Sequence, residues 1–235
     1  MNASGDRLEN YRQRYAACKP GWEPATARYQ RRVARLLTPT AHVLDLGCGR
    51  GGIAERLSGF GQWMGLDPDH VSLREHRLPD LLRAQADALR LPLGSATFDL
   101  VVSSWVMEHL SDPPRVFDEV ARVLRPGGRL ICLTPNARHP IPRLGQILAH
   151  WQRTLVPKVY GRGVADAFPV YYRANTPEQL SRLGAQAGLR LVNIELVEDP
   201  SYFSWNRSTF ALAARLEILL PALWKVHLIA EFTHH

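Results

Sequence analysis

The middle of the chain alternates short apolar runs with stretches whose apolar residues recur at helical spacing. Val43, Leu44 and Leu46 form one such run and predict a buried parallel strand. We expect strands at residues 42–46, 62–67, 82–87, 98–104 and 129–136. Helical spacing occupies residues 53–57, 71–78, 106–110 and 116–124. Strands that alternate with helices predict an α/β fold, with a parallel sheet between two helical layers.

Both ends of the chain add further elements. Residues 1–25 are polar with scattered aromatic residues, and two proline-containing pairs break any long helix there. A helix follows over residues 27–37 and stops at Pro39. Residues 137–175 are an insertion rich in proline, histidine, tryptophan and tyrosine, after which Thr176 is the expected N-cap of another helix. The remaining elements are a strand at 189–197, a loop at 201–205, an apolar helix at 209–220 and a final strand at 226–232.

Composition narrows the class of protein. A chain of 235 residues, with 46% hydrophobic and 22% charged residues, has the composition of a globular protein that folds as one domain. The net charge of +7 comes mostly from arginines spread along the chain, so we expect a solvated basic surface and no nucleic-acid partner. Three cysteines without zinc spacing favour free thiols in the cytoplasm. We expect neither a signal segment nor a membrane span.

The strand at 42–46 leads into a glycine-rich turn, Gly47-Cys48-Gly49-Arg50-Gly51-Gly52. Glycines allow a tight turn and a close approach of the backbone to a ligand, so we expect a nucleotide-like ligand here. The spacing is ambiguous, because it contains both G-x-G-x-x-G and G-x-G-x-G. Asp45 distinguishes between a loop that binds a pyrophosphate and a turn that binds a cationic ligand. A carboxylate just before the turn would repel a pyrophosphate, but it suits a ligand with a cationic amine or sulfonium.

The segment from Asp45 through Gly51 resembles motif I of the class I S-adenosylmethionine-dependent methyltransferases. Residues 98–136 are closely similar to motifs IV to VI of small-molecule methyltransferases. The resemblance implies S-adenosylmethionine as the cofactor and a Rossmann-like, doubly wound seven-stranded sheet whose last strand is antiparallel. It also implies one domain over residues 1–235. Its expected parts are N-terminal lid helices at 1–40, a cofactor-binding core at 41–136, a substrate-side insertion at 137–175, and the rest of the sheet with an extra helix at 176–235.

The N-terminal helices have two expected placements. In methyltransferases that this chain resembles, such a leader folds over the cofactor as a lid. Packing on the edge of the sheet is the alternative.

Acidic residues follow three of the predicted strands at their carboxyl ends, where ligands of open α/β sheets bind. Asp67 stands at the separation from the glycines at which a carboxylate meets ribose hydroxyls. The resemblance gives Asp87 a hydrogen bond from the adenine amino group, and capping of the next turn is its alternative role. The expected cofactor-binding residues are Asp45, Gly47, Cys48, Gly49, Gly51, Asp67, Pro68, Asp87, Ala88 and Ser103.

Methyl transfer from a sulfonium needs positioning, a dry site and a base for the acceptor proton. His109 and His139 are the expected catalytic residues, with Tyr171 as a further base candidate. An orienting bond to a backbone carbonyl is the alternative role of His109. The turn at 108–110 and the insertion are most similar to the O-methyltransferases of ubiquinone biosynthesis, some of which bind magnesium through Glu-x-x-Glu-His. Trp105 replaces the first glutamate here, so we expect no metal.

The expected reaction is methyl transfer to a small-molecule acceptor, at a hydroxyl oxygen of a hydrophobic or natural-product-like substrate. An NAD(P)-dependent oxidoreductase and a non-catalytic cofactor-binding module stay open as alternatives. Apolar and cationic residues mix over residues 140–172, which suits a lid over a greasy acceptor or reversible contact with a membrane. The helix at 209–220 either lies beside them or, as we favour, packs on the sheet. A monomer and a homodimer are both compatible with the sequence.

Overall fold

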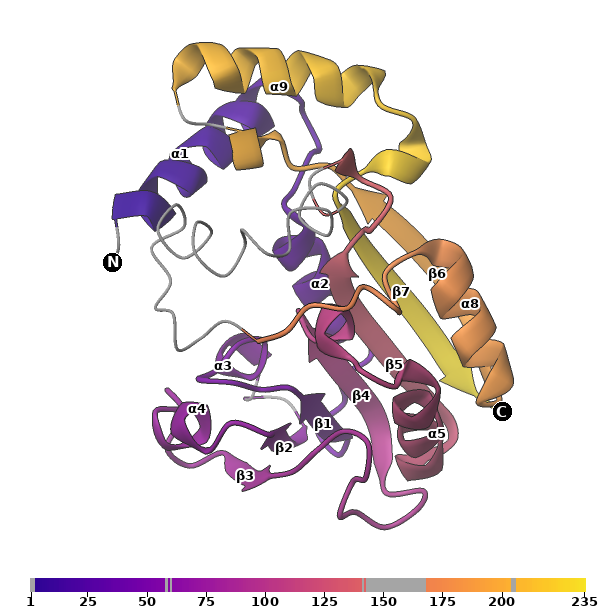
Figure 1. The fold of residues 1–235 in the computed structure, drawn as a ribbon. Helices are drawn as coiled ribbons and strands as arrows, with labels where there is room; N and C mark the ends of the chain where they lie inside the picture. Colours follow the sequence, from indigo (N-terminus) through magenta and orange to yellow (C-terminus); the bar gives the residue numbers. More distant parts are fainter. Residues whose placement is uncertain (1–2, 58, 60, 141, 143–167, 204–205) are drawn as a thin grey trace.

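The computed structural model describes the chain except for residues 1–2, 58, 60, 141, 143–167 and 204–205. Most of the insertion predicted at 137–175 therefore lies outside the described residues. In the described part, seven strands form one sheet in the order β3-β2-β1-β4-β5-β7-β6 (Figure 1). The strands are β1 (His42–Leu46), β2 (Gln62–Asp67), β3 (Leu82–Gln85), β4 (Phe98–Ser104), β5 (Leu124–Pro135), β6 (Leu189–Val197) and β7 (His227–His234). The predicted seven-stranded sheet is confirmed.

All of these strands except β7 point in one direction. β1 pairs in parallel with β2 and β4, and Val43 lies beside both Trp63 and Leu100. β7 lies between β5 and β6 and is antiparallel to both, as predicted for the last strand. Its first residue consequently lies at the edge where the parallel strands end. We call this the carboxyl edge of the sheet, which is where ligands of open α/β sheets bind.

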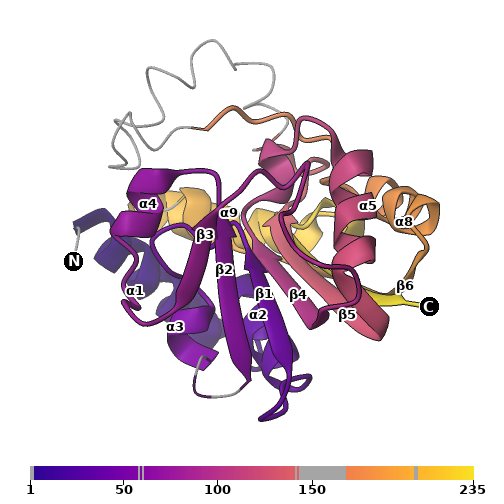
Figure 2. The same cartoon turned by 90° about the horizontal axis from the view of Figure 1, so that it is seen from below.

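Helices cover both faces of the sheet (Figure 2). They include α2 (Ala25–Ala34), α3 (Ala54–Leu57), α4 (His70–Arg74), α5 (Pro113–Val123) and α8 (Pro177–Gln186). On the face of α5 and α8, Phe117 and Leu180 are buried in one apolar cluster with Phe232 of β7. On the face of α2 and α3, the buried cluster includes Val43 and Ile229. Burial of apolar side chains on both faces stabilises the sheet between the helices.

Side-chain caps mark the beginning of two helices. The Thr176 hydroxyl accepts the amide hydrogen of Gln179 at 3.2 Å, and Pro177 occupies the first turn of α8. Asp112 caps α5 in the same way through the amide of Arg115. Both caps satisfy amides that have no partner within their helix. The predicted N-cap at Thr176 is thus confirmed.

Three elements differ from the predicted pattern. α4 ends at Arg74, although helical spacing extends to Leu78, and residues 106–110 form only a 3-10 turn, η1 (Met107–His109). Apolar spacing over so few residues does not distinguish a helix from a turn. β5 begins at Leu124, earlier than predicted, because Leu124 already pairs with Phe98 of β4.

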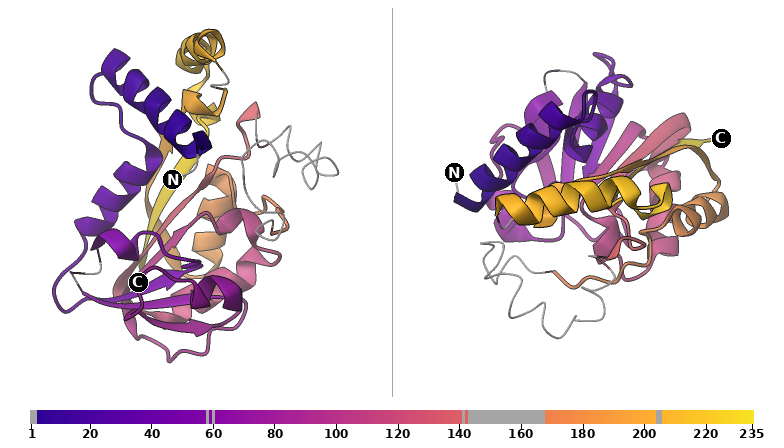
Figure 3. Two further views of the ribbon diagram at one scale, coloured as in Figure 1. Left: turned by 90° about the vertical axis from the view of Figure 1, so that its left-hand side faces the viewer. Right: turned by 90° about the horizontal axis from the view of Figure 1, so that it is seen from above.

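Two helices lie together above the carboxyl edge, α1 (Ala3–Cys18) and α9 (Arg207–Leu219) (Figure 3). The rings of Tyr11 and Phe210 are 4.7 Å apart, and η3 (Pro200–Phe203) contacts both helices. α9 therefore packs mainly on η3 and α1 instead of on the sheet, which corrects the expectation for this helix. No helix in the described residues is both long and apolar enough to cross a membrane.

Candidate functional site

The turn after β1 is held by its neighbours in the sheet. The amides of Gly47 and Cys48 both donate to the carbonyl oxygen of Leu66, at 2.7 and 3.1 Å. The Ser103 hydroxyl donates to the carbonyl oxygen of Leu46 at 3.0 Å. The thiol of Cys48 is buried, and this burial raises its pKa to about 12. Ser103 and Cys48, both predicted to bind the cofactor, thus support the turn itself.

Three glycines of the turn adopt backbone conformations that other residues avoid. The φ angle is +78° at Gly47, +52° at Gly49 and +131° at Gly51. Gly52 has no such φ, and no atom lies within 4 Å of the place where its Cβ would stand. A Cβ on Gly47 would overlap the side chain of Val106. The backbone therefore uses the G-x-G-x-G spacing, which resolves the ambiguity of the sequence.

Asp45 is a buried acid at the end of β1. Only 3% of the residue is exposed. Burial, followed by the charge of Asp67, raises its pKa to about 7, and no hydrogen bond from the described residues offsets these effects. A buried carboxylate in this state suits a cationic ligand group, because the cation offsets the cost of burying the negative charge.

Asp67 ends β2 and contacts the turn directly. Its Oδ2 accepts the amide hydrogen of Gly49, and its Oδ1 accepts that of Asp69, both at 2.8 Å. Each oxygen keeps a second lone pair, so the predicted contact with ribose hydroxyls is compatible with these bonds. Pro68 follows on the surface, where its carbonyl oxygen accepts the side-chain amide of Gln85 at 2.9 Å.

Asp87 lies next to Asp67 at the edge of the sheet. The amide of Ala86 donates to the carbonyl oxygen of Asp67 at 3.1 Å, which brings the two segments together. Asp87 is exposed, and its Oδ1 accepts the amide hydrogen of Leu89 at 2.9 Å, across the turn that contains Ala88. The capping role is therefore present, and Oδ2 stays available for the predicted adenine contact.

Tyr29 of α2 is a site residue that the sequence did not reveal. Its side chain is buried, and burial together with the charge of Asp45 raises the pKa of its hydroxyl well above the usual value. The hydroxyl thus lies within electrostatic reach of the buried acid. In the sequence Tyr29 is one aromatic residue in a helical pattern, and only the packing of α2 on the sheet brings it to Asp45.

His109 lies in η1, directly after β4. Its Nδ1 is 2.7 Å from the carbonyl oxygen of Pro169, and its ring is 6.0 Å from the ring of Phe168. A neutral imidazole bonded in this way carries its proton on Nδ1 and a lone pair on Nε2. Tyr171, the further base candidate, is 43% exposed, with the guanidinium of Arg173 over its ring at 5.4 Å.

His139 lies after the end of β5 and is buried. Its amide donates to the carbonyl oxygen of Asn136 at 3.0 Å. Its Nε2 is 3.8 Å from Oε2 of Glu217, which comes from α9. The two predicted catalytic histidines therefore follow neighbouring strands, and His109 is the more accessible of the two.

Glu108 points into the protein, in contrast to the next residue, the predicted catalytic His109. Its Oε2 accepts the hydroxyl hydrogen of Thr134 at 2.9 Å, and the Thr134 oxygen accepts a hydrogen from the Asn175 side chain at 2.6 Å. This carboxylate therefore belongs to a buried network between β5 and the start of α8. Among the residues that the structure describes, no group of three or more histidine, cysteine, aspartate or glutamate side chains could hold a metal ion.

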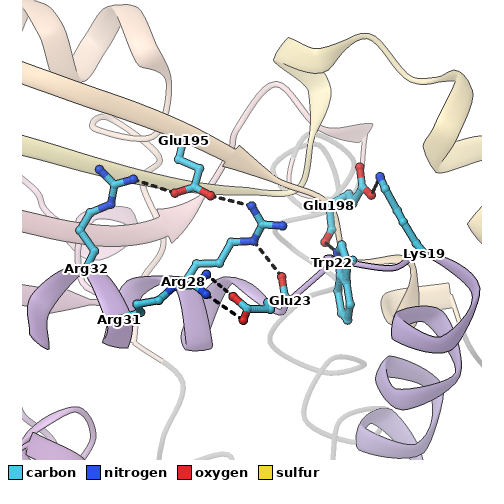
Figure 4. Close-up of polar contacts among 8 residues, drawn as sticks. All are labelled: Lys19, Trp22, Glu23, Arg28, Arg31, Arg32, Glu195 and Glu198. Carbon is cyan, nitrogen blue, oxygen red and sulfur yellow. Dashed lines mark hydrogen bonds and ion pairs between the residues drawn. The ribbon is translucent and has the colours of Figure 1, made fainter. Parts of the chain in front are cut away.

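Ion pairs connect the N-terminal helices to β6 and to the residue that follows it (Figure 4). Arg28 and Arg32 of α2 both pair with Glu195, at 2.7 and 2.9 Å. Glu198, directly after β6, pairs with Lys19, which follows α1. These contacts hold the link between α1 and α2 against the sheet. Closure of the N-terminal helices over the cofactor stays a prediction.

Comparisons with known proteins agree with this geometry. Residues 44–132 match the family described as "Methyltransferase domain". A demethylmenaquinone methyltransferase from Lactiplantibacillus plantarum is 31% identical over 178 residues, covering 68% of this chain and 74% of the relative. A ubiquinone biosynthesis O-methyltransferase from Xylella fastidiosa is 30% identical over 242 positions, covering 93% of this chain and 94% of the relative. The crystal structure of an S-adenosylmethionine dependent methyltransferase from Mesorhizobium loti has a TM-score of 0.64 at 20% identity, over 90% of this chain and 98% of that one.

The fold and the glycine turn thus define a class I methyltransferase. The chain belongs to the S-adenosylmethionine-dependent methyltransferases, and S-adenosylmethionine is its cofactor. The residues of the site fit that group, because Asp45 is a buried acid suited to a cation and three glycines with positive φ allow the backbone of the turn to lie close to a ligand. The nicotinamide alternative is set aside by this family membership.

The glycine geometry predicts a contrast between two single substitutions. Gly47→Ala forces a side chain into a positive φ and against Val106, whereas Gly52→Ala does neither. Backbone strain of this kind costs about 1–3 kcal/mol, so we expect Gly47→Ala to weaken S-adenosylmethionine binding by about tenfold or more. Gly52→Ala should bind within about twofold of the wild type. Isothermal titration measures both, and equal losses would show that the G-x-G-x-x-G spacing matters after all.

The raised pKa of Asp45 predicts a pH-dependent affinity for the cofactor. Below pH 7 the folded protein keeps this carboxyl protonated, and it ionises as the pH rises through about 7. A cationic cofactor prefers the ionised form, so affinity should rise by about tenfold from pH 6 to pH 8. Asp45→Asn should bind more weakly and lose this part of the pH dependence. Titration of the ligand's own amine is common to both proteins and cancels in the comparison.

Proposed function

We propose that this enzyme methylates a hydroxyl oxygen of a hydrophobic small molecule. The observation that carries the proposal is the orientation of His109, whose Nδ1 is bonded to the carbonyl oxygen of Pro169. Its Nε2 then offers a lone pair directly after β4, at the carboxyl edge. A hydroxyl must lose its proton when its oxygen is methylated, and a neutral imidazole can accept it. The name of the O-methyltransferase relative supports an oxygen acceptor.

Each part of the site has a defined task in this reaction. When bound, S-adenosylmethionine supplies an electrophilic methyl group, which leaves its sulfur for the acceptor. Asp45 binds the cationic part of the cofactor, and Asp67 binds its ribose. His109 accepts the hydroxyl proton at Nε2, and His139 is the second candidate for this role. α1 and α9, above the carboxyl edge, limit the access of water, so the gain comes mainly from positioning in a dry site.

A cytoplasmic location is part of the proposal. Cys18, Cys48 and Cys132 are all free thiols. A reducing compartment keeps thiols in this state.

An acceptor screen tests the proposed reaction. The purified protein is incubated with S-adenosylmethionine labelled in its methyl group and with alkylphenols, each paired with the analogue whose hydroxyl is already methylated. We expect label in the phenols and none in the blocked analogues. His109→Ala should lower kcat by about 10²–10⁴ while cofactor affinity is unchanged.

The exposed histidine His235 provides the matched control, since it follows the end of β7 at the edge of the sheet opposite the carboxyl edge, and His235→Ala removes an imidazole away from the site. It should turn over at the wild-type rate. Label on carbon or nitrogen, or label in the blocked analogues, would contradict transfer to oxygen. Wild-type rates in both His109→Ala and His139→Ala would show that catalysis proceeds by proximity alone.

The outer face of α9 supports a second part of the proposal. Leu212, Leu216 and Leu219 share one side of this helix and are 59%, 52% and 79% exposed. The charged side chains exposed on the described part of α9 are Arg207 and Arg215, both cationic. An exposed apolar stripe with basic neighbours is typical of a helix that lies in a headgroup layer. We therefore propose that α9 contacts an anionic membrane surface, from which a greasy acceptor enters.

Liposome flotation tests the membrane contact. The wild type should float with anionic vesicles at low salt, and added salt should weaken binding because it screens the basic side chains. Leu216→Asp and Leu219→Asp should each reduce the bound fraction several-fold. Leu82→Asp changes a similarly exposed leucine in β3, the outermost strand on the side of the sheet away from β6. This substitution should leave the bound fraction unchanged. Absence of flotation at low salt, or self-association through α9 in its place, would contradict the proposal.

A further inference from the structure

A second polar cluster lies at the carboxyl edge, and of its members the reaction proposed above uses only His139, as the second candidate base. Its central residue is His227, the first residue of β7. Because β7 is antiparallel to its neighbours, His227 lies opposite Pro135 at the end of β5 and opposite Val197 at the end of β6. A residue near the C-terminus of the chain therefore lies at the edge where the methyl acceptor is expected.

His227 is buried, yet one of its nitrogens lacks a partner. Its Nε2 is 2.8 Å from the hydroxyl oxygen of Tyr202 in η3. Its Nδ1 has no hydrogen-bond partner among the described residues, although the residue is only 2% exposed. Burial lowers its pKa to about 4, so the imidazole is neutral at physiological pH. Buried polar atoms normally have partners, so an unpaired nitrogen here calls for an explanation.

Trp105 connects His227 to the cofactor turn. Its indole lies edge-on to the His227 ring, with the centroids 5.1 Å apart. Trp105 has a φ of +61°, which is uncommon for a large residue, and such strain clusters at functional sites. The next residue is Val106, whose side chain lies against Gly47. Trp105 and Val106, which are adjacent in the sequence, therefore contact the histidine and the glycine turn respectively.

Glu217 adds a second unpaired atom to the cluster. It comes from the inner side of α9 and is 5% exposed. Its Oε2 is 3.8 Å from Nε2 of His139, and its Oε1 has no hydrogen-bond partner in the described part of the chain. His139 also affects His227 electrostatically, which places the three side chains in one region. Three elements, α9, β7 and the segment after β5, therefore bring polar groups to one buried place.

We propose that His227 and Glu217 form a subsite that binds a polar substituent of an aromatic methyl acceptor, apart from the hydroxyl that is methylated. Trp105 and Tyr202 provide aromatic contacts for the ring. A carboxylate oxygen only accepts hydrogen bonds, so the substituent carries a hydrogen, as a hydroxyl group does. The inference rests on the proposed function and assigns the specificity of that site to residues of β7 and α9.

A pair of ligands that differ by one hydroxyl tests the subsite. Hexylresorcinol and the matching hexylphenol are titrated into the enzyme saturated with S-adenosylhomocysteine. We expect the wild type to bind hexylresorcinol at least about tenfold more tightly, since a hydrogen bond to a buried charged group has this effect. His227→Phe keeps the ring contact with Trp105 but removes the nitrogen, and Glu217→Gln keeps the shape but removes the charge. Each should reduce the preference to about twofold or less.

Matched variants separate a binding role from a structural one. His76 is another buried histidine with an unpaired Nε2 among the described residues, and it lies beyond α4, away from this cluster. His76→Phe should keep the full preference, and His227→Gln, which restores polar atoms, should recover part of it. If His227→Phe does not fold, Glu217→Gln supplies the same measurement from another element. Equal binding of both ligands by the wild type, or a preference that survives both substitutions, would overturn the subsite.

The same ligands distinguish this inference from the proposed function. Transfer of label to phenols without any ligand preference would support O-methylation and overturn the subsite. A preference that depends on His227 and Glu217, without transfer of label to oxygen, would support the subsite and contradict O-methylation.

Discussion

The carbonyl oxygen of Leu66 accepts the amide hydrogens of Gly47 and Cys48, and these two hydrogen bonds set the position of the glycine turn on which the predicted cofactor site depends. They bind the turn after β1 to the end of β2, and Asp67 then binds Gly49 two residues further along. Backbone groups that leave a sheet need partners, and here the ends of the two strands satisfy each other. The turn is consequently held in place by the protein itself. A cofactor that enters meets amides and acids that are already oriented, which reduces the ordering cost of binding.

The part of the site that could be predicted from the sequence is the part made by local patterns. Apolar runs and glycine positions are local features, so the strand at β1, its turn and the acid Asp67 were all predictable. The choice between Gly51 and Gly52 was not, because it depends on φ angles. The proximity of His227 to Trp105 was also hidden, since β7 pairs beside β5 only in the folded sheet. The apolar composition of α9 predicted a buried helix, but composition does not specify which neighbour covers it.

Buried charges organise the opposite side of the site. Arg12 of α1 donates two hydrogen bonds to Asp199, at 3.0 and 2.7 Å. Asp199 is the residue that follows Glu198 in the sequence. Lys225, just before β7, pairs with Glu198 from the other side at 2.9 Å. Removal of one partner from such a set leaves a charge buried alone, which is costly. The helix α1, the end of β6 and the start of β7 are therefore positioned together.

The direction of β7 has a consequence for how such an enzyme can diversify. A strand antiparallel to its neighbours brings its first residue, and the helix before it, back to the edge where the other strands end. The predicted cofactor residues Asp45, Asp67 and Asp87 come from the first half of the chain, whereas Glu217 and His227 of the proposed subsite come from α9 and β7. The proposed roles therefore assign recognition of the cofactor and recognition of the acceptor to separate stretches of sequence. With these roles, substitutions in α9 and β7 can change the preferred acceptor while the glycine turn after β1 stays as it is.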